Sequence, residues 1–299
     1  GIFWLTALLA LAGIAMLYLA VPQPRIIRRH RDAEAVPALF RRVLANGELL
    51  RLDFGIFAQH AILTATFLAL PLAIRQAGGF GGRQWLFYLP ILAIAFLLMT
   101  PFIVIGEKYR RMKPVFIGAV AAVGLGQLSL LVWHGNLWAI GAGLLVFFAA
   151  FSLLEASLPS LISKVAPADG KGTAMGVYSS SQFLGIFVGG AAGGWIQGAF
   201  APHGLAAVFA FAAVLALIWL VVAATMPAPR YLASRLIRLA GIGDEAAAGA
   251  ELLAVPGVAE AVVVGEEGVA YLKVDPETID EAALAALTAD RDAMAAGST

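Results

Sequence analysis

Long apolar runs, separated by short gaps, occupy the first 226 residues of this chain. A helix needs about 20 apolar residues to cross the hydrocarbon core of a bilayer, and each run provides them. Because a soluble fold has no use for so many spans of this length, the pattern predicts an all-α polytopic membrane protein with seven spans. The runs lie near residues 1–21, 50–74, 84–105, 114–133, 137–163, 173–200 and 204–226.

The overall composition agrees with a lipid environment. Hydrophobic residues make up 61% of the chain and charged residues 13%, and a soluble domain of that composition would expose large apolar patches. The net charge of +1 provides no basic field, so nucleic acid is not an expected partner. The chain has no cysteine, which excludes disulfides, thiolate catalysis and cysteine metal sites, and we expect neither a metal nor a cofactor.

Basic residues gather in alternate gaps between the runs, whereas the intervening gaps hold few. Loops rich in Lys and Arg stay in the cytoplasm, so the alternation predicts one fixed orientation in a bacterial inner membrane, with the residues after Met226 also cytoplasmic. A single basic gap would equally suit an ordinary solvated loop. The basic gaps contain Arg25, Arg28, Arg29, Arg31, Arg41 and Arg42, then Lys108, Arg110, Arg111 and Lys113, then Lys164 and Lys171.

The first gap, residues 22–49, is a basic linker long enough to hold structure of its own. Val36, Leu39, Phe40 and Val43 follow a helical spacing beside two of the arginines. This spacing predicts a short amphipathic helix that lies on the cytoplasmic face of the membrane.

A small soluble domain is predicted for residues 227–299, with a hairpin turn at Gly265–Gly268. Its order β-α-β-β-α is that of a ferredoxin-like α+β unit without the last strand. The five elements are expected at residues 231–240, 243–258, 259–264, 269–275 and 279–290. Heavy-metal-binding domains of this order carry two cysteines after the first strand. Residues 240–244 have none, which excludes thiolate metal binding, and a helix cap explains Asp244 better than a metal ligand does.

Ionisable side chains within the spans are the places to look for function, because each costs about 2.5–3.5 kcal/mol on insertion scales. In the second span an acid, an imidazole and a hydroxyl share one helical face beside Gln59, which predicts a wet cavity. That face consists of Asp53, Phe57, His60, Thr64 and Phe67. Two simpler interpretations stay open: Asp53 pairs with Arg51 at the membrane interface, and His60 is a neutral histidine bonded to a neighbouring helix.

In the fifth span Ser152, Glu155, Pro159 and Ser163 form one stripe. Desolvation disfavours the ionised form of a carboxylic acid, so Glu155 is suited to take up and release a proton near neutral pH. Glu155, His60 and Asp53 are therefore the candidate proton or substrate groups. The alternative for Glu155 is a permanent ion pair with an arginine outside this chain.

Glycines recur in the sixth span, largely at intervals of four residues. Such spacing permits close helix contact, either as static packing or as a surface along which a helix slides. The glycines are Gly172, Gly176, Gly185, Gly189 and Gly193. Tyr178 and Gln182 of this span join Gln59, Thr64 and Ser152 as candidate cavity-lining residues.

Six spans after a long basic loop, with the turn GEKYRRMK between the second and third of them, resemble the C-terminal half of a major facilitator superfamily transporter. The family's turn has the form Gly-x-x-x-Asp-Arg-x-Gly-Arg-Lys. Gly106 and Arg111 hold corresponding places, whereas Arg110 replaces the acid. Gly106, Lys108, Arg110 and Arg111 are the candidates for this cytoplasmic basic turn.

The segments LLEASLPSLISK and KGTAMGVYSSSQFLG, with the appended α+β unit, narrow the resemblance to YajR-type inner-membrane transporters. On this resemblance residues 1–21 are helix six of the family, residues 50–226 are its six-helix C-terminal bundle, and an N-terminal half is missing. The chain opens at Gly1 inside an apolar run with no basic segment before it, which suggests part of a longer protein rather than a signal peptide.

The resemblance implies alternating access around a cavity lined by helices one, four, seven and ten. Asp53, His60 and Thr64 then fall on helix seven, and Ser152 and Glu155 on helix ten. We expect proton-coupled export of a small organic solute or drug across the lipid bilayer.

The alternative is a sensory C-terminal module that binds a small ligand or anion and biases the gate of a transporter half that is not competent alone. An enzyme is not expected, because the chain has no HExxH motif, GxSxG elbow or paired catalytic aspartates.

Overall fold

The structure is a computed structural model that describes residues 2–22, 36–228, 231–239, 242 and 244–297. The predictions that concern Arg25, Arg28, Arg29, Arg31, Ala240, Gly241 and Gly243 lie outside these residues. The first helix, α1 (Ile2–Ala20), belongs to a unit of its own and is apolar along its whole length. At about 1.5 Å per residue its 19 residues extend roughly 28 Å, close to the thickness of a bilayer core.

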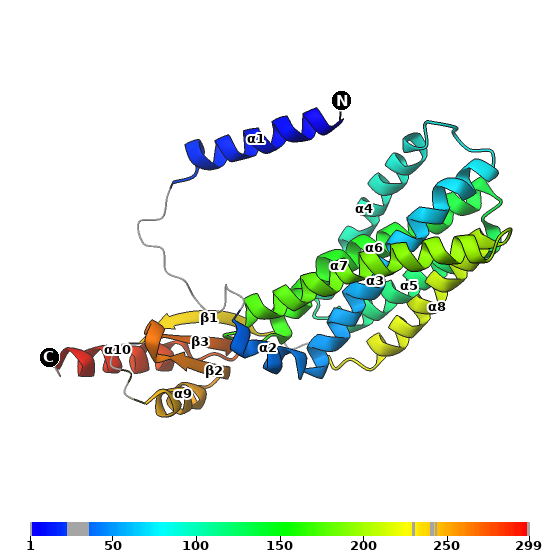
Figure 1. Cartoon of the computed structure of the whole chain (residues 1–299). Coiled ribbons are helices and arrows are strands. Elements are labelled where there is room, and N and C mark those ends of the chain that lie inside the picture. The colour runs from blue at the N-terminus through cyan, green and yellow to red at the C-terminus, as the bar shows by residue number, and fades with distance from the viewer. Residues whose placement is uncertain (1, 23–35, 229–230, 240–241, 243, 298–299) are drawn as a thin grey trace. The chain divides into compact units, whose positions relative to one another are not determined.

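Seven further helices follow among the described residues up to Ala224. Figure 1 labels them α2 to α8. Within the described part of the chain, six helices are long and apolar enough to cross a membrane: α1, α3, α4, α5, α6 and α8. The predicted sixth span, α7, has 29 residues but does not meet that criterion, because glycines and the run from Ser179 to Gln182 lower its hydropathy. The helices are α2 (Pro37–Leu44), α3 (Gly47–Gln76), α4 (Trp85–Lys108), α5 (Met112–Trp133), α6 (Leu137–Val165), α7 (Lys171–Ala199) and α8 (Gly204–Ala224).

Asparagine caps explain where the two long helices α3 and α6 begin. The side chain of Asn46 accepts hydrogen bonds from the backbone N–H groups of Glu48 and Leu49 at the start of α3. Asn136 does the same for Trp138 and Ala139 at the start of α6. These caps satisfy donors that the first turn of a helix leaves free. The short helix α2 confirms the helical spacing predicted in the basic linker, and its Val43 is fully buried.

Close contact between α3 and α7 depends on glycine. A Cβ atom on Gly185 would overlap the backbone oxygen of Phe57, and one on Gly189 would overlap that of Ala61. The prediction of a glycine contact is confirmed for these two residues. It is wrong for Gly176, where a Cβ would meet nothing within 4 Å.

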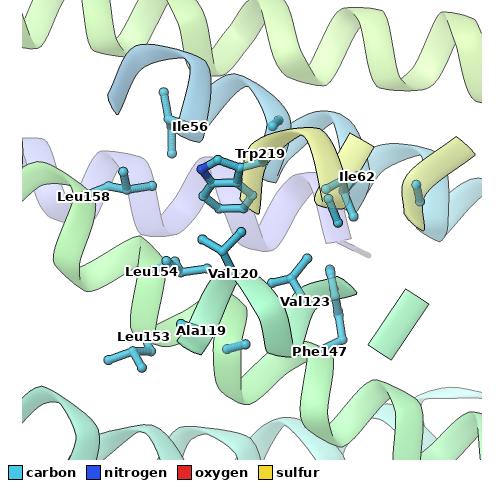
Figure 2. Packing of buried hydrophobic residues seen from close by; sticks show 14 of the residues in the cluster. Ile56, Ile62, Ala119, Val120, Val123, Phe147, Leu153, Leu154, Leu158 and Trp219 are labelled. Carbon is cyan, nitrogen blue, oxygen red and sulfur yellow. The ribbon is translucent and has the colours of Figure 1, made fainter. Parts of the chain in front are cut away.

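Trp219 of α8 lies at the centre of the membrane bundle's core, as the close-up in Figure 2 shows. Its side chain is fully buried, and the Phe116 ring of α5 meets it edge-on at a centroid distance of 6.2 Å. One polar contact crosses this core: the Thr66 hydroxyl donates to Gln127 Oε1 over 3.1 Å, and both residues are 0% exposed. The core residues labelled around Trp219 are Ile56, Ile62, Ala119, Val120, Val123, Phe147, Leu153, Leu154 and Leu158.

The C-terminal part has the predicted βαββα order. The sheet order is β1-β3-β2 with both pairs antiparallel, so that Tyr271 in the central strand lies opposite Leu236 on one side and Val262 on the other. This order is the ferredoxin-like arrangement without its outer fourth strand. The elements are β1 (Ala233–Arg238), α9 (Glu245–Ala254), β2 (Val258–Val264), a short 3-10 turn (Gly265–Glu267), β3 (Val269–Val274) and α10 (Glu281–Gly297).

Two local details of this domain follow from its sequence. The Asp244 carboxylate accepts hydrogen bonds from the backbone N–H groups of Ala246 and Ala247, which confirms the helix-cap interpretation of that residue. In the predicted hairpin turn Gly268 has a φ of +64°, a conformation that glycine adopts without strain.

Candidate functional site

Four polar side chains from three helices meet inside the membrane bundle. The Gln59 amide of α3 donates to Glu155 Oε2 of α6 over 2.9 Å. The Gln182 amide nitrogen of α7 lies 3.5 Å from Glu155 Oε1 and 2.9 Å from His60 Nε2. His60 Nε2 is 3.8 Å from Glu155 Oε2. We call these four residues the polar cluster; each of them was a candidate from the sequence, and the structure brings them together.

Gln59 and His60 are the buried members of the polar cluster, and Glu155 is the more accessible of its two ionisable groups. The side chain of His60 is 8% exposed, whereas that of Glu155 is 40% exposed. The His60 ring also lies against Phe151 of α6, with a centroid distance of 5.7 Å and an interplanar angle of 61°. A proton on Glu155 therefore has access to the exterior of the bundle, and an imidazole lies within reach behind it.

Helix geometry explains why these residues converge. Gln59 and His60 are consecutive on α3, so their side chains diverge by about 100°; Gln59 faces α6 and His60 turns to α7. Gln182 precedes Gly185 by one turn of α7. Because glycine contact brings the α7 backbone against α3, the Gln182 amide is able to reach the His60 ring.

Among the described residues, Thr64 is the only other predicted site residue that a side-chain hydrogen bond joins to the polar cluster. Both Asp53 carboxylate oxygens are buried without a hydrogen-bond partner in the described part of the chain, as is the Tyr178 hydroxyl. Arg51 donates to the backbone oxygen of Gly47 instead, so the alternative pair with Asp53 is not seen. The Thr64 hydroxyl donates to the backbone oxygen of His60, and Ser152 lies partly buried one turn before Glu155.

The basic turn between α4 and α5 is held by an acid that sequence reasoning overlooked. Glu107 forms an ion pair with Lys164 of α6, with Nζ and Oε2 2.7 Å apart, and accepts a 3.0 Å hydrogen bond from the Ser160 hydroxyl. Ser160 and Lys164 are four residues apart and so share one face of α6, a spacing from which this site could have been predicted. Gly106 is buried against Met112, whereas Lys108, Arg110 and Arg111 are exposed.

Tyr231, just after α8, was also overlooked. Its hydroxyl donates to the backbone oxygen of Gly106 and accepts from the backbone N–H of Met112. Its ring lies under the Lys164 ammonium at 4.9 Å and the Arg110 guanidinium at 5.4 Å. Arg110 adopts a φ of +54° and pairs with Glu277 at 2.8 Å. The sequence contains no motif that predicts this role of Tyr231, because the partners of the tyrosine lie far from it along the chain.

Comparison with known proteins establishes the family. The model of the Major Facilitator Superfamily matches residues 1–190 and 106–256, which together cover most of the chain. The chain belongs to the major facilitator superfamily. Its expected resemblance to YajR-type members is also confirmed: it is 42% identical over 276 residues to the inner membrane transport protein YajR of Escherichia coli (strain K12), covering 92% of this chain and 60% of YajR.

Two further relatives of this superfamily member come from Buchnera aphidicola. One, an uncharacterised transporter of subsp. Baizongia pistaciae, is 32% identical over 158 residues, covering 52% of this chain and 40% of the relative. Another, from subsp. Acyrthosiphon pisum, is 26% identical over 191 residues, covering 63% of this chain and 49% of the relative. The chain thus spans about half the length of the curated relatives it matches. All three are named as transporters, in agreement with the expectation that the chain is not an enzyme.

The polar cluster and the Glu107–Lys164 pair both lie in the part of the chain that the family model matches. The chain is a multi-pass membrane protein with an appended α+β domain. The polar cluster lies on α3, α6 and α7. The Glu107–Lys164 ion pair lies beside the basic turn. The motif described above has an acid where this chain has Arg110, and the acid of this turn is instead Glu107, one residue after Gly106.

Proposed function

We propose that this chain is the C-terminal half of a secondary active transporter that couples proton movement to export of a small organic solute. The convergence of Glu155, His60, Gln59 and Gln182 from three helices supports this most directly. An acid and an imidazole whose nearest atoms lie 3.8 Å apart can exchange a proton once either side chain turns to shorten that distance, and the two amides supply polar contacts for a solute.

The proposal assigns Glu155 to proton exchange and His60 to proton or substrate binding, with Asp53 as a second buried acid. Thr64, Ser152 and Tyr178 would line the path near the cluster. The alternative, in which Glu155 pairs permanently with an arginine of another segment, assigns the carboxylate a structural role. A transport measurement on a Glu155 variant distinguishes the proton-exchange role from the structural role.

The proposed assembly places the basic turn and the C-terminal domain in the cytoplasm of a bacterium and the spans in its inner membrane. An N-terminal half would complete the central cavity. Alternating access would then expose the polar cluster to one side of the membrane at a time.

The decisive experiment reconstitutes the complete transporter, an N-terminal half joined to this chain, into sealed liposomes with a pH-sensitive dye inside. Under a pH gradient, a transported solute from a chemically varied panel should move protons and should itself accumulate against its gradient. A protonophore should abolish the uphill movement. Solute flux that is the same with and without a pH gradient would contradict proton coupling.

A second candidate function is regulation by the C-terminal domain, and one buried lysine favours it. Lys273 of β3 is 4% exposed and donates hydrogen bonds to the backbone oxygens of Lys164, over 2.7 Å, and of Ala166. Those carbonyls terminate α6, the helix that carries Glu155. Burial lowers the pKa of the Lys273 amine, and the Glu260 carboxylate 3.9 Å away opposes that shift.

Further ion pairs support the same contact. Arg42 of α2 lies 3.2 Å from Asp169, in the loop between α6 and α7, and 3.6 Å from Glu260 of β2. Glu260 also accepts from the backbone N–H of Ala168 over 3.3 Å. The linker helix, the α6–α7 loop and the domain therefore share one polar contact, through which a ligand bound to the domain would act on α6 and α7.

Replacement of Lys273 by methionine should uncouple the domain from α6. We expect backbone amide exchange near the end of α6 to become at least about tenfold faster, because a buried charged hydrogen bond contributes roughly 1.5–3 kcal/mol. Hydrogen exchange with mass spectrometry on the complete transporter measures this. Arg238→Met, an exposed basic residue of the same domain, is the matched control. Unchanged transport and effector response after deletion of residues 229–299 would argue against regulation.

A further inference from the structure

The two neighbours of His60 determine which of its ring nitrogens carries hydrogen. His60 Nδ1 lies 3.2 Å from the backbone oxygen of Ile56, and a carbonyl oxygen only accepts, so Nδ1 must donate. His60 Nε2 lies 2.9 Å from the Gln182 amide nitrogen, which only donates. Nε2 must therefore accept. The arrangement is that of a neutral imidazole with its hydrogen on Nδ1.

This contact cannot survive protonation of His60. A proton that binds the Nε2 lone pair places an N–H group against the N–H of Gln182 at 2.9 Å, where no acceptor remains. The nearest carboxylate is Glu155, whose Oε2 is 3.8 Å from Nε2. An imidazolium is attracted to that oxygen. The Gln182 amide has to withdraw, because turning over would place its own oxygen against Glu155 Oε1, which also only accepts. Its 3.5 Å contact with Glu155 Oε1 is then lost as well.

The surrounding charges leave Glu155 as the partner of the imidazolium. On α3, Asp53 lies two turns before His60, and on α7 the Tyr178 hydroxyl lies one turn before Gln182. On α6 the next ionisable group is Lys164, which pairs with Glu107. The sequence of α8 contains no ionisable residue, and α2 contributes Arg41 and Arg42 at the start of α3.

The same contact joins two helices. Within the described residues, the bond between Gln182 and His60 is the only side-chain hydrogen bond that links α3 to α7. It lies one turn from Gly185, where the two backbones touch. Breaking it removes this hydrogen bond at one end of the glycine contact between α3 and α7.

We propose that Gln182 is a positioning residue: it holds neutral His60 with Nε2 as an acceptor and releases α7 from α3 when His60 takes up a proton. The proton binds the Nε2 lone pair, no other covalent bond changes, and Glu155 replaces Gln182 as the partner of the ring. The inference rests on the proposed proton coupling for its role in transport, but not for its geometry.

Nitrogen NMR of histidine in the complete transporter, labelled with ¹⁵N and embedded in lipid nanodiscs, tests the geometry without transport. His60 is assigned by its loss in His60→Gln. At alkaline pH wild-type His60 should show the Nδ1–H tautomer. Gln182→Glu replaces the donor by a carboxylate acceptor, so His60 should stay doubly protonated where the wild type is neutral. Ser180→Glu adds a carboxylate to an exposed position of α7 and should leave the His60 signals unchanged.

A pH profile tests the role in transport. Gln182→Leu removes the donor but keeps an apolar side chain of similar length. It should move the half-maximal pH of solute flux by about one unit, even where the maximal rate falls because a polar contact to the solute is lost. A loss of maximal rate at every pH with an unmoved profile would show a merely structural role and overturn the proposal.

The NMR result distinguishes this inference from the proposed function. An Nε2–H tautomer in the wild type, or His60 signals unaffected by Gln182→Glu, overturns the inference even if transport proves to be proton-coupled. The Nδ1–H tautomer with the expected response to Gln182→Glu sustains the geometry even if the flux experiment finds no proton movement.

Discussion

Glutamine in place of Glu155 is expected to lower proton-coupled flux about 100-fold or more, because an amide does not take up a proton. A side chain that transfers a proton typically raises a rate by roughly 10²–10⁴-fold. The substitution preserves the size of the side chain and leaves an oxygen that still accepts the 2.9 Å hydrogen bond from Gln59. The polar cluster should therefore stay assembled. Proton uptake by liposomes containing the complete transporter measures the effect, and thermal unfolding of the purified variant tests whether it is folded.

The matched variant for this prediction is Glu155→Asp, which retains an acid but shortens the side chain by one methylene. It should keep part of the flux, since the carboxyl group still takes up a proton near His60. If Glu155→Gln sustains proton-coupled flux within threefold of wild type, Glu155 has no part in proton exchange, and the structural alternative holds.

Valine in place of Gly189 should destabilise the membrane bundle by about 3 kcal/mol or more, because its Cβ atom would overlap the Ala61 backbone oxygen. A backbone atom cannot move aside as a flexible side chain does, so α7 and α3 would have to separate along their contact. The loss should appear as a lower unfolding temperature and a lower yield of folded protein in detergent.

Gly198→Val is the matched control on the same helix. A Cβ on Gly198 meets nothing within 4 Å, and valine costs a helix no more than glycine does. Its stability should stay within about 0.5 kcal/mol of wild type. Equal damage from both substitutions would mean that glycine is needed throughout α7 for backbone flexibility rather than for close contact with α3.

Hydropathy was sufficient to predict most of the helices, because lipid offers no hydrogen bonds and every span must satisfy its own backbone. It was least reliable for α7, where Ser179 to Gln182 and the glycines serve contact with other helices rather than with lipid. Glu155 and His60 could be singled out for the same reason: an ionisable group within a span persists only where protein or water receives it.

The chain's amino-acid order alone determined the spans, the βαββα order of the C-terminal domain and the candidate acids, since each depends on local periodicity or on the cost of placing charge in lipid. Only the tertiary structure decided that Gln182 contacts His60 and that Glu107 pairs with Lys164. The same holds for the hydrogen bond that Lys273 donates to a backbone oxygen at the end of α6. Those partners are 122, 57 and 109 residues apart in sequence. No periodic pattern reaches so far, because the distance between two side chains on different helices is set by how the helices pack.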